Sequence, residues 1–241
     1  EQMSSDLVVM AVSGALLLVV FAAILVRRRY RQRLERLAQT RALCRSAEQL
    51  LGIARAIAPL LDDYRAVELM LTMAAKAVDH AHHQNPNDPG VNRGITALNE
   101  LTEGLPRQLG SAALPLVSEE QLAAANQQFV EAQRAVSRAE RHAILPESEA
   151  QEMIQHLAWR LLQLGVDCHS HLAATAMSRN DKSAAHEHYR QALLLLRKST
   201  DTRAQRHDLM RRIRATLDEL EATSSGASLI STSPRSGQSE H

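Results

Sequence analysis

The sequence predicts an all-helical protein with one N-terminal transmembrane helix, and three observations carry this prediction. The chain has 241 residues, 45% of them hydrophobic, yet it contains only one Trp, three Tyr and two Phe, so the apolar content is mostly Leu, Ala, Val and Ile. Glycine and proline number nine and seven, a composition that favours helices over turn-rich β-structure. Residues 7–26 contain no charged side chain.

The uncharged stretch 7–26 is long enough to be a transmembrane helix. At ~1.5 Å per residue it extends about 30 Å, the thickness of a bilayer core. Only acidic charges precede it, and an arginine cluster follows it, formed by Arg27, Arg28, Arg29, Arg31 and Arg33. Because Lys and Arg mark the cytoplasmic flank, we expect residues 1–6 outside and the remainder in the cytoplasm. A cleaved signal peptide would need a basic start and a shorter apolar run.

Residues 27–105 are predicted to form a juxtamembrane helix and a helical hairpin. The spanning helix continues to Pro59, which breaks it. Its apolar seam alternates in steps of four and three residues, as in a helix that packs on another: Leu43, Ala47, Leu50, Ala54, Ile57 and Leu61. Further helices are expected at 63–83 and 91–103, separated by a loop at 84–90. A connector with prolines and glycines, 106–117, follows.

Residues 118–222 are predicted to form a helical repeat-like domain. Ser118 and Gln121 form a capping box, in which the Ser hydroxyl accepts from a free amide and the Gln reaches back. The expected helices are 119–143, 147–177, 182–198 and 202–222. Phe129 and Trp159 are interpreted as core residues. The Ser- and Gly-rich segment 223–241 has almost no core-forming residues, and we expect it to be a disordered tail.

Residues 166–199 resemble one tetratricopeptide repeat. The match consists of Asn180-Asp181 at the turn between two helices and of five packing positions: Leu172, Ala173, Ala185, Tyr189 and Ala192. The sequence departs from the family at Ala176, where an aromatic is usual, at His169, where Trp is common, and at Arg197, where Pro often ends the repeat. The resemblance implies closely packed helix pairs, a surface that binds protein segments and no chemistry. Helix 202–222 resembles the helix that caps such arrays.

Catalytic motifs are absent from the sequence, so we expect no enzymatic activity and no cofactor. There is no Gly-rich phosphate loop, G-x-S-x-G, H-E-x-x-H or C-x-x-C. The candidates for a metal site are Cys168 and His171, which share a helix face, and His186 or His188 across the hairpin turn. Counting residues from the turn puts His171 about opposite His188. Cys and neutral His suit zinc, but Cys168 lies on the apolar stripe, where a thiol packs as a small hydrophobic group. The prediction is therefore no metal.

The predicted function is that of a membrane-anchored cytoplasmic scaffold or adaptor that binds protein partners, within a larger envelope assembly. Only Lys76, Lys182 and Lys198 are lysines among 28 basic residues. Such arginine-rich usage is typical of GC-rich bacterial genomes and indicates an inner membrane. Lipids are expected to contact the transmembrane helix and the arginine cluster. Nucleic acid is not expected, since Tyr30 is the only aromatic among the arginines and no binding module is recognisable.

Two alternatives stay open at this stage. The first is a dimeric signalling or regulatory subunit, in which the juxtamembrane seam pairs with a second copy and transmits a state through the helix. The second is a metal-dependent enzyme that uses the Cys168 and His171 region. A homo-oligomer is compatible with the adaptor, with the signalling subunit and with the metal-dependent enzyme.

Overall fold

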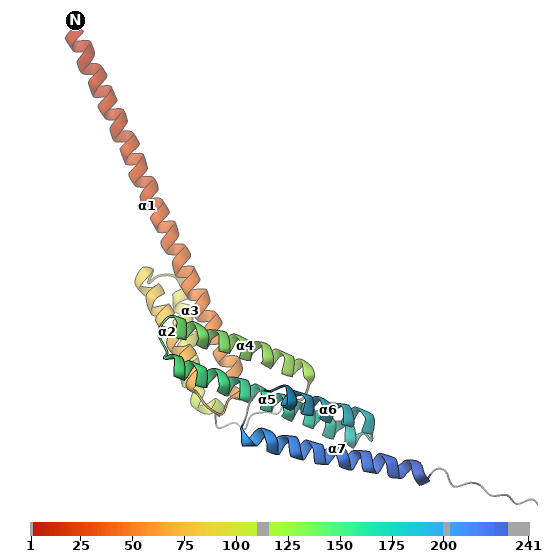
Figure 1. Cartoon of the computed structure of the whole chain (residues 1–241). Helices are drawn as coiled ribbons and strands as arrows, with labels where there is room; N and C mark the ends of the chain where they lie inside the picture. The colour runs from red at the N-terminus through yellow and green to blue at the C-terminus, as the bar shows by residue number, and fades with distance from the viewer. Residues whose placement is uncertain (1, 110–115, 200–202, 231–241) are drawn as a thin grey trace, which may run out of the picture. The chain divides into compact units, whose positions relative to one another are not determined.

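The protein is all-helical within the residues that its computed structural model describes. These are residues 2–109, 116–199 and 203–230, with side chains described for 21, 24–104, 116–199 and 203–222. Over these ranges seven α-helices pack as antiparallel pairs (Figure 1). The chain divides into two compact units. The first unit comprises residues 1–52 and 71–104, and the second unit comprises residues 53–70 and 105–241.

Helix α1 (Gln2–Ile57) is continuous for 56 residues. It ends where the sequence predicts, because Pro59 lies in a short 3₁₀ turn, η1 (Ala58–Leu60), after which Leu61 is extended. Of the predicted span 7–26, side chains are described only at Phe21, Ile24, Leu25 and Val26, and the rest of that prediction lies outside them. Over the side chains that are described, no helix has the length and apolar character needed to cross a membrane.

The first unit packs α1 against parts of α2 (Arg65–Gln84) and α3 (Pro89–Leu109). Its buried side chains include Ala47 and Leu50 of the predicted seam and Val78 of α2. The buried Thr40 hydroxyl lies 2.9 Å from the Arg36 carbonyl oxygen and 3.2 Å from Gln84 Oε1. A polar group buried in this core therefore has its hydrogen-bond partners.

The start and the end of α3 differ in how well the sequence predicts them. Pro89 is its first residue, where a missing N–H costs nothing, and the Asp88 carboxylate accepts a hydrogen bond of 2.8 Å from the Gly90 N–H. The predicted end at residue 103 is wrong, because the helix continues through Gly104 and Pro106 to Leu109. One proline removes one backbone hydrogen bond and can kink a helix without ending it. Of the predicted connector 106–117, residues 110–115 lie outside the described ranges.

The second unit contains α4 (Glu119–Arg141), α5 (Glu147–Ser178), α6 (Lys182–Lys198) and α7 (Ala204–Ile230). Helix α5 contacts α4 and α6, and α6 also contacts α7. The predicted capping box is present: the Ser118 hydroxyl accepts from the Gln121 N–H at 3.2 Å, and Gln121 Oε1 accepts from the Val117 N–H at 2.9 Å. In the turn before α6, Asn180 has a φ of 60° and Asp181 caps the helix.

The core of the second unit is continuous across α5, α6 and α7. One cluster of buried residues consists of Val166, Ala192, Leu193, Leu196, Ile213 and Leu217. Phe129 and Trp159 are buried, as predicted, and the Arg203 guanidinium lies 5.3 Å from the centroid of the Trp159 ring. This cation–π contact and the hydrogen bond of 2.7 Å from Arg206 Nε to the Leu196 carbonyl place the start of α7.

The end of α7 also differs from the prediction. The helix was expected to stop at residue 222, but it continues to Ile230, within the segment expected to be a disordered tail. The first proline after α7 is Pro234, so no helix-breaking residue lies at the predicted boundary. Residues 231–241 of the predicted tail lie outside the described ranges.

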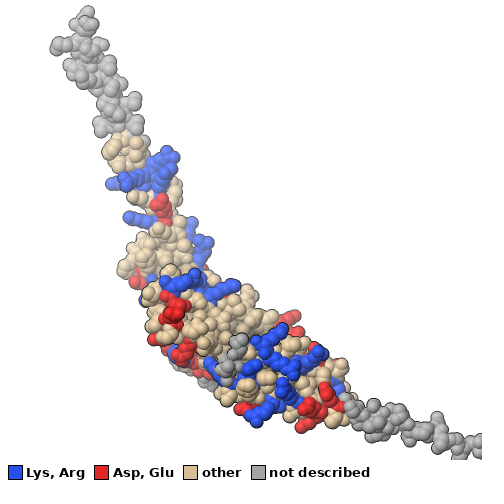
Figure 2. Space-filling model, viewed as in Figure 1, with Lys and Arg blue, Asp and Glu red and all other residues tan. Residues whose placement is uncertain are grey.

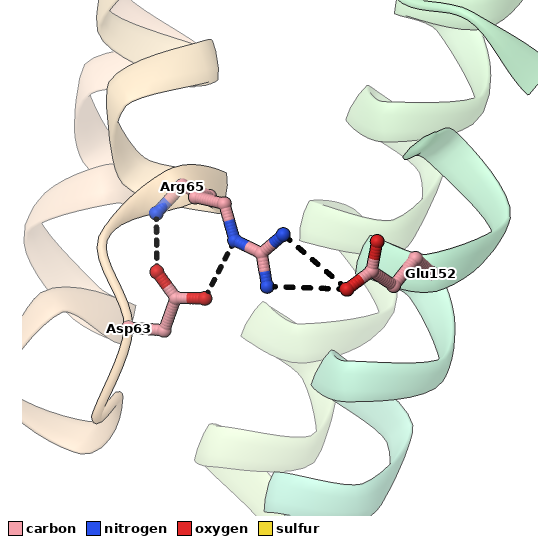
Figure 3. A network of polar contacts seen from close by, with 3 residues as sticks. All are labelled: Asp63, Arg65 and Glu152. Atoms are coloured by element: carbon pink, nitrogen blue, oxygen red, sulfur yellow. Dashed lines mark hydrogen bonds and ion pairs between the residues drawn. The ribbon is translucent and has the colours of Figure 1, made fainter. Parts of the chain in front are cut away.

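Two side chains of α5, Glu152 and Arg160, bind the first residue of α2 and the last residue of η1. Arg65 donates to both Asp63 carboxylate oxygens, at 3.0 Å from its backbone N–H and 2.7 Å from Nε, and its guanidinium also reaches Glu152 Oε1 at 3.3 Å (Figure 3). Two turns further along α5, Arg160 Nε donates to the Leu60 carbonyl oxygen at 2.7 Å. Because Arg160 is only 12% exposed, its hydrogen bond is worth about 1.5–3 kcal/mol.

Glycine to alanine substitutions at positions 52 and 94 should change stability in opposite directions. A Cβ at Gly52 has no atom within 4 Å, so Gly52→Ala should raise the free energy of unfolding by about 1 kcal/mol through helix propensity. A Cβ at Gly94 would lie 2.9 Å from Cγ2 of the buried Val78. Overpacking a rigid β-branched side chain costs about 1–3 kcal/mol, so Gly94→Ala should lower stability. Urea denaturation measures the change in the free energy of unfolding in each variant. A change in the same direction in both variants would contradict this packing.

Asp63 should make stability depend on acid pH. Burial by itself would raise the pKa of Asp63, but the hydrogen bonds from Arg65 outweigh burial and lower the pKa. A carboxylate with a lowered pKa contributes stability that is present above its ordinary value of about 3.9 and is lost as pH falls through the lower folded value. Asp63→Asn should therefore lower the free energy of unfolding at pH 7 by up to about 1 kcal/mol, and the difference from wild type should disappear as the pH falls through the folded pKa of Asp63.

The matched control for this pH series is Asp218→Asn on α7, where the side chain is exposed. Denaturation curves of the three proteins at pH 7, 4 and 2 provide the comparison. If Asp63→Asn differs from wild type by the same amount at every pH, the carboxylate charge is not the source of the stabilisation.

Candidate functional site

A groove of about 890 Å³ lies over the middle of α5, between α4 and α6, entirely within the second unit. Helix α5 forms its floor, and the N-terminal half of α4 and most of α6 form its walls. The residues that line it are Glu119, Leu122, Ala123 and Asn126 from α4; Ala158, Leu161, Leu162, Gly165 and His169 from α5; and Glu187, His188, Gln191, Leu195, Lys198 and the following Ser199. We refer to this surface as the α4–α6 groove.

Helical periodicity explains why these residues share one surface. Ala158, Leu161, Gly165 and His169 of α5 follow one another in steps of three and four residues, which place side chains on one face of an α-helix, and Leu162 lies next to Leu161. The same spacing relates the groove residues of α4 and those of α6. Because α4 and α6 each run antiparallel to α5, the N-terminal ends of both walls lie at the same end of the groove.

Gly165 lets one leucine side chain from each wall approach the backbone of α5. A Cβ at this position would lie 3.0 Å from Leu195 Cδ1 of α6 and 3.9 Å from Leu122 Cδ1 of α4. Both leucines therefore reach across the backbone of α5 at the point where α5 has no side chain. Together with Leu161 and Leu162 they form an apolar floor that is only half-buried.

Three polar side chains meet at the N-terminal end of the walls. Glu119, His169 and His188 come from α4, α5 and α6, and one ligand atom from each lies within 4.8 Å of the other two. His188 Nδ1 is 3.9 Å from Glu119 Oε1, and the two imidazole centroids are 5.7 Å apart. We refer to these three residues as the His–His–Glu cluster.

The buried imidazole of this cluster has an unsatisfied nitrogen. His169 is 9% exposed, and neither its Nδ1 nor that of His188 has a hydrogen-bond partner. Burial lowers the pKa of His169, the His188 ring lowers it further, and Glu119 opposes the change. His169 is therefore held neutral near pH 7, with a free lone pair available on its ring.

The predicted metal candidates do not come together as a set. His188 is in the cluster, but His171 is exposed on another side of α5. Cys168 is fully buried, its Sγ lies 3.5 Å from the Ser118 carbonyl oxygen, and burial followed by the nearby Glu119 charge raises the pKa of its thiol. The expectation that His171 faces His188 is wrong. Counting residues from the turn ignores the helical phase, and residue 169, not 171, points toward α6.

The sequence carries a signal for His169 that the apolar stripe conceals. His169 continues the spacing of Leu161 and Gly165, which lies beside the stripe that contains Cys168. Gly165, one turn before His169, lets side chains of neighbouring helices approach the backbone closely at that level. Glu119 lies within the predicted capping box, between Ser118 and Gln121, and was not among the predicted metal candidates. His186, two residues before His188, instead lies 3.2 Å from Glu221 of α7.

The predicted repeat-packing residues lie next to the groove, between α5 and α6. Ala173, Ala176 and Ala185 form a buried cluster, and Tyr189 packs against this cluster and against the larger core. Ala192 is buried in that core, whereas Leu172 is half-buried. These small side chains allow α5 and α6 to approach closely.

The predicted arginine cluster lies on α1 in the first unit. Its members, Arg27, Arg28, Arg29, Arg31 and Arg33, are all exposed. Figure 2 shows basic side chains gathered on the visible face of α1 in this region. Every residue of α1 from 24 to 39 is exposed, so none of the side chains that the structure describes covers this stretch.

Comparisons with known proteins do not identify a family for this chain. No protein-family model matches it, and neither a curated protein nor a solved structure does. A function must therefore be inferred from the α4–α6 groove, the His–His–Glu cluster and the N-terminal part of α1.

Proposed function

We propose that this protein is a membrane-anchored helical adaptor whose α4–α6 groove binds a short amphipathic helix of a partner protein. The observation that carries the proposal is the half-buried leucine floor of the groove. Leu161 and Leu162 come from α5, and Leu122 and Leu195 extend over α5 from the two walls. A helix placed between α4 and α6 would cover these leucines, as the apolar face of a helix does in groove recognition.

The dimensions and charges of the groove specify the occupant. Glu187 and Lys198 line its two ends on α6 and are eleven residues apart, which corresponds to about 16 Å, or three helical turns. One end carries Glu119 and Glu187 and the other carries Lys198. The expected partner helix has about three turns, an apolar face, basic residues toward the glutamate end and acidic residues toward Lys198.

The repeat-like packing of α5 and α6 supports an adaptor role. Alanines pack at the α5–α6 contact, Tyr189 packs against two core clusters, and α7 packs against α6, a packing that is compatible with the tetratricopeptide resemblance. Proteins built from such helix pairs present extended binding surfaces on rigid helices. No covalent chemistry is part of this proposal.

The membrane anchor is the second part of the proposal. Phe21, Ile24, Leu25 and Val26 are 60%, 57%, 44% and 67% exposed on α1. Apolar side chains in a row without cover are unfavourable in water, and a bilayer around residues 7–26 would cover them. The arginine cluster then lies at the lipid headgroups on the cytoplasmic side of an inner membrane, with the second unit in the cytoplasm.

Burial of the juxtamembrane seam favours the adaptor over a subunit that dimerises through this seam. Ala47, Leu50, Ala54, Ile57 and Leu61 are at most 7% exposed within a single chain. A second copy could pair with them only after these contacts were broken. The exposed stretch of α1 nearer the membrane is rich in arginine, and like charges oppose close pairing there.

The adaptor function can be tested by site-specific photo-crosslinking in membranes of the source cells. A photoreactive residue at Gln191, on the groove wall, should crosslink one defined partner, whereas the same residue at Arg190, outside the groove, should not.

Leu195→Glu places a carboxylate among the floor leucines and should weaken binding of the identified partner helix 10- to 100-fold, since the contact of one buried leucine is worth about 1.5–3 kcal/mol.

Leu194→Glu is the matched control, because Leu194 is exposed on the same helix but does not line the groove. It should leave partner affinity unchanged. Equal crosslinking at positions 190 and 191, or equal loss of affinity in the two glutamate variants, would rule out the groove as the binding site.

The anchor is tested by deleting residues 2–26. The full chain should sediment with membranes and resist extraction by alkaline carbonate, because apolar burial in the bilayer does not depend on salt or charge. The deletion variant should become extractable while keeping the helical circular dichroism of the remaining chain. Retention of the deletion variant in carbonate-washed membranes would show that another part of the chain holds it there.

A further inference from the structure

The His–His–Glu cluster leaves buried polar atoms without partners. His169 Nδ1 and His188 Nδ1 are both buried and make no hydrogen bond. A buried polar atom that lacks a partner costs about 1–3 kcal/mol. Both atoms belong to imidazoles that face one another and a carboxylate across three helices, which indicates a ligand between them.

We propose that Glu119, His169 and His188 bind a zinc ion at the glutamate end of the α4–α6 groove. Two imidazoles and one carboxylate are a ligand set that zinc accepts, and three protein ligands leave a fourth tetrahedral position free. Calcium and magnesium prefer oxygen ligands alone, so two imidazoles argue against them. The inference does not depend on the adaptor function, because zinc can bind whether or not the groove holds a partner.

The three ligand atoms need to move only a short distance toward one another to bind zinc. Zinc bonds of about 2.0–2.1 Å place tetrahedral ligand atoms about 3.3 Å apart, and the three ligand atoms now lie within 4.8 Å of one another. His169 is fixed by burial, whereas the side chains of Glu119 and His188 are 67% and 24% exposed. The distances between the ligand atoms must shorten by up to about 1.5 Å, and movement of the two less buried side chains, Glu119 and His188, can provide this change.

The position of the ligands gives zinc a structural effect. Glu119 is the first residue of α4, and the two histidines lie on α5 and α6. One ion would join both walls of the groove to its floor at this end. The fourth position would face the groove, where water or a side chain of an occupant can fill it. Cys168, although adjacent to His169, lies against the Ser118 carbonyl and is not a ligand.

Zinc titration of the full chain tests the proposal. The chain has 11 histidines, so the protein should carry no histidine tag and should be stripped of metal with a chelator before calorimetry in detergent. We expect one zinc ion per chain and a rise in melting temperature on zinc addition. Glu119→Gln and His188→Ala should each lower zinc affinity at least about 100-fold, more than the loss of an outer-shell partner.

Two histidines on the same helices provide matched controls. His171→Ala on α5 and His186→Ala on α6 remove an imidazole outside the cluster and should leave zinc affinity and stoichiometry unchanged. His169→Gln is the third ligand variant, and its melting temperature without zinc shows whether it folds. Residue 119 is exposed, so Glu119→Gln should fold. If His169→Gln does not fold, the zinc affinity of Glu119→Gln tests the site. Cobalt substitution should give the visible spectrum of a tetrahedral site in wild type and not in Glu119→Gln.

Two results would overturn the proposal. The first is that the stripped wild-type chain takes up no stoichiometric zinc. The second is that zinc affinity is the same in Glu119→Gln and His188→Ala as in wild type, since the ion would then be held by other residues.

Discussion

Helix α5 packs with α4 on one side and α6 on the other, and the rest of the second unit depends on this packing. Close packing of two helices needs small side chains where the backbones approach. The α5–α6 contact has Ala173, Ala176 and Ala185 at that level, and α4 buries four alanines with Phe129 and Val136. With two sides of α5 occupied, a third face stays open between the walls, and this face is the floor of the α4–α6 groove.

The same helix positions the segment before α2. Arg160 donates to the Leu60 carbonyl, and Glu152 accepts from Arg65. Arg160 is nearly buried and satisfies a backbone oxygen that follows the proline break, so this contact is worth more than the exposed ion pair of Arg65. The 32-residue length of α5 allows it to make these contacts and still extend to His169 and the turn that precedes α6.

The sequence was enough to predict that these segments are helices and where most of them begin, because the signals for both are local. Pro59 ends α1, and Ser118 with Gln121 caps α4, through interactions among residues at most four apart. Two helix ends were placed too early. At Gly104 and at residue 222 the composition changes, but α3 and α7 continue to Leu109 and Ile230. A change in composition is a weaker signal than a cap or a proline.

The sequence by itself determined that the chain is helical, where its strongest breaks fall, and that an uncharged stretch is followed by arginines, since these depend on neighbouring residues and on periodicity. Only the tertiary structure decided which histidine meets which. His169 and His171 are two residues apart on α5, yet a rotation of about 100° per residue places them on different sides. The approach of α6 over Gly165 selects His169, and the start of α4 adds Glu119 from 50 residues away in the chain. Long-range packing of this kind leaves no local pattern in the residues that it joins.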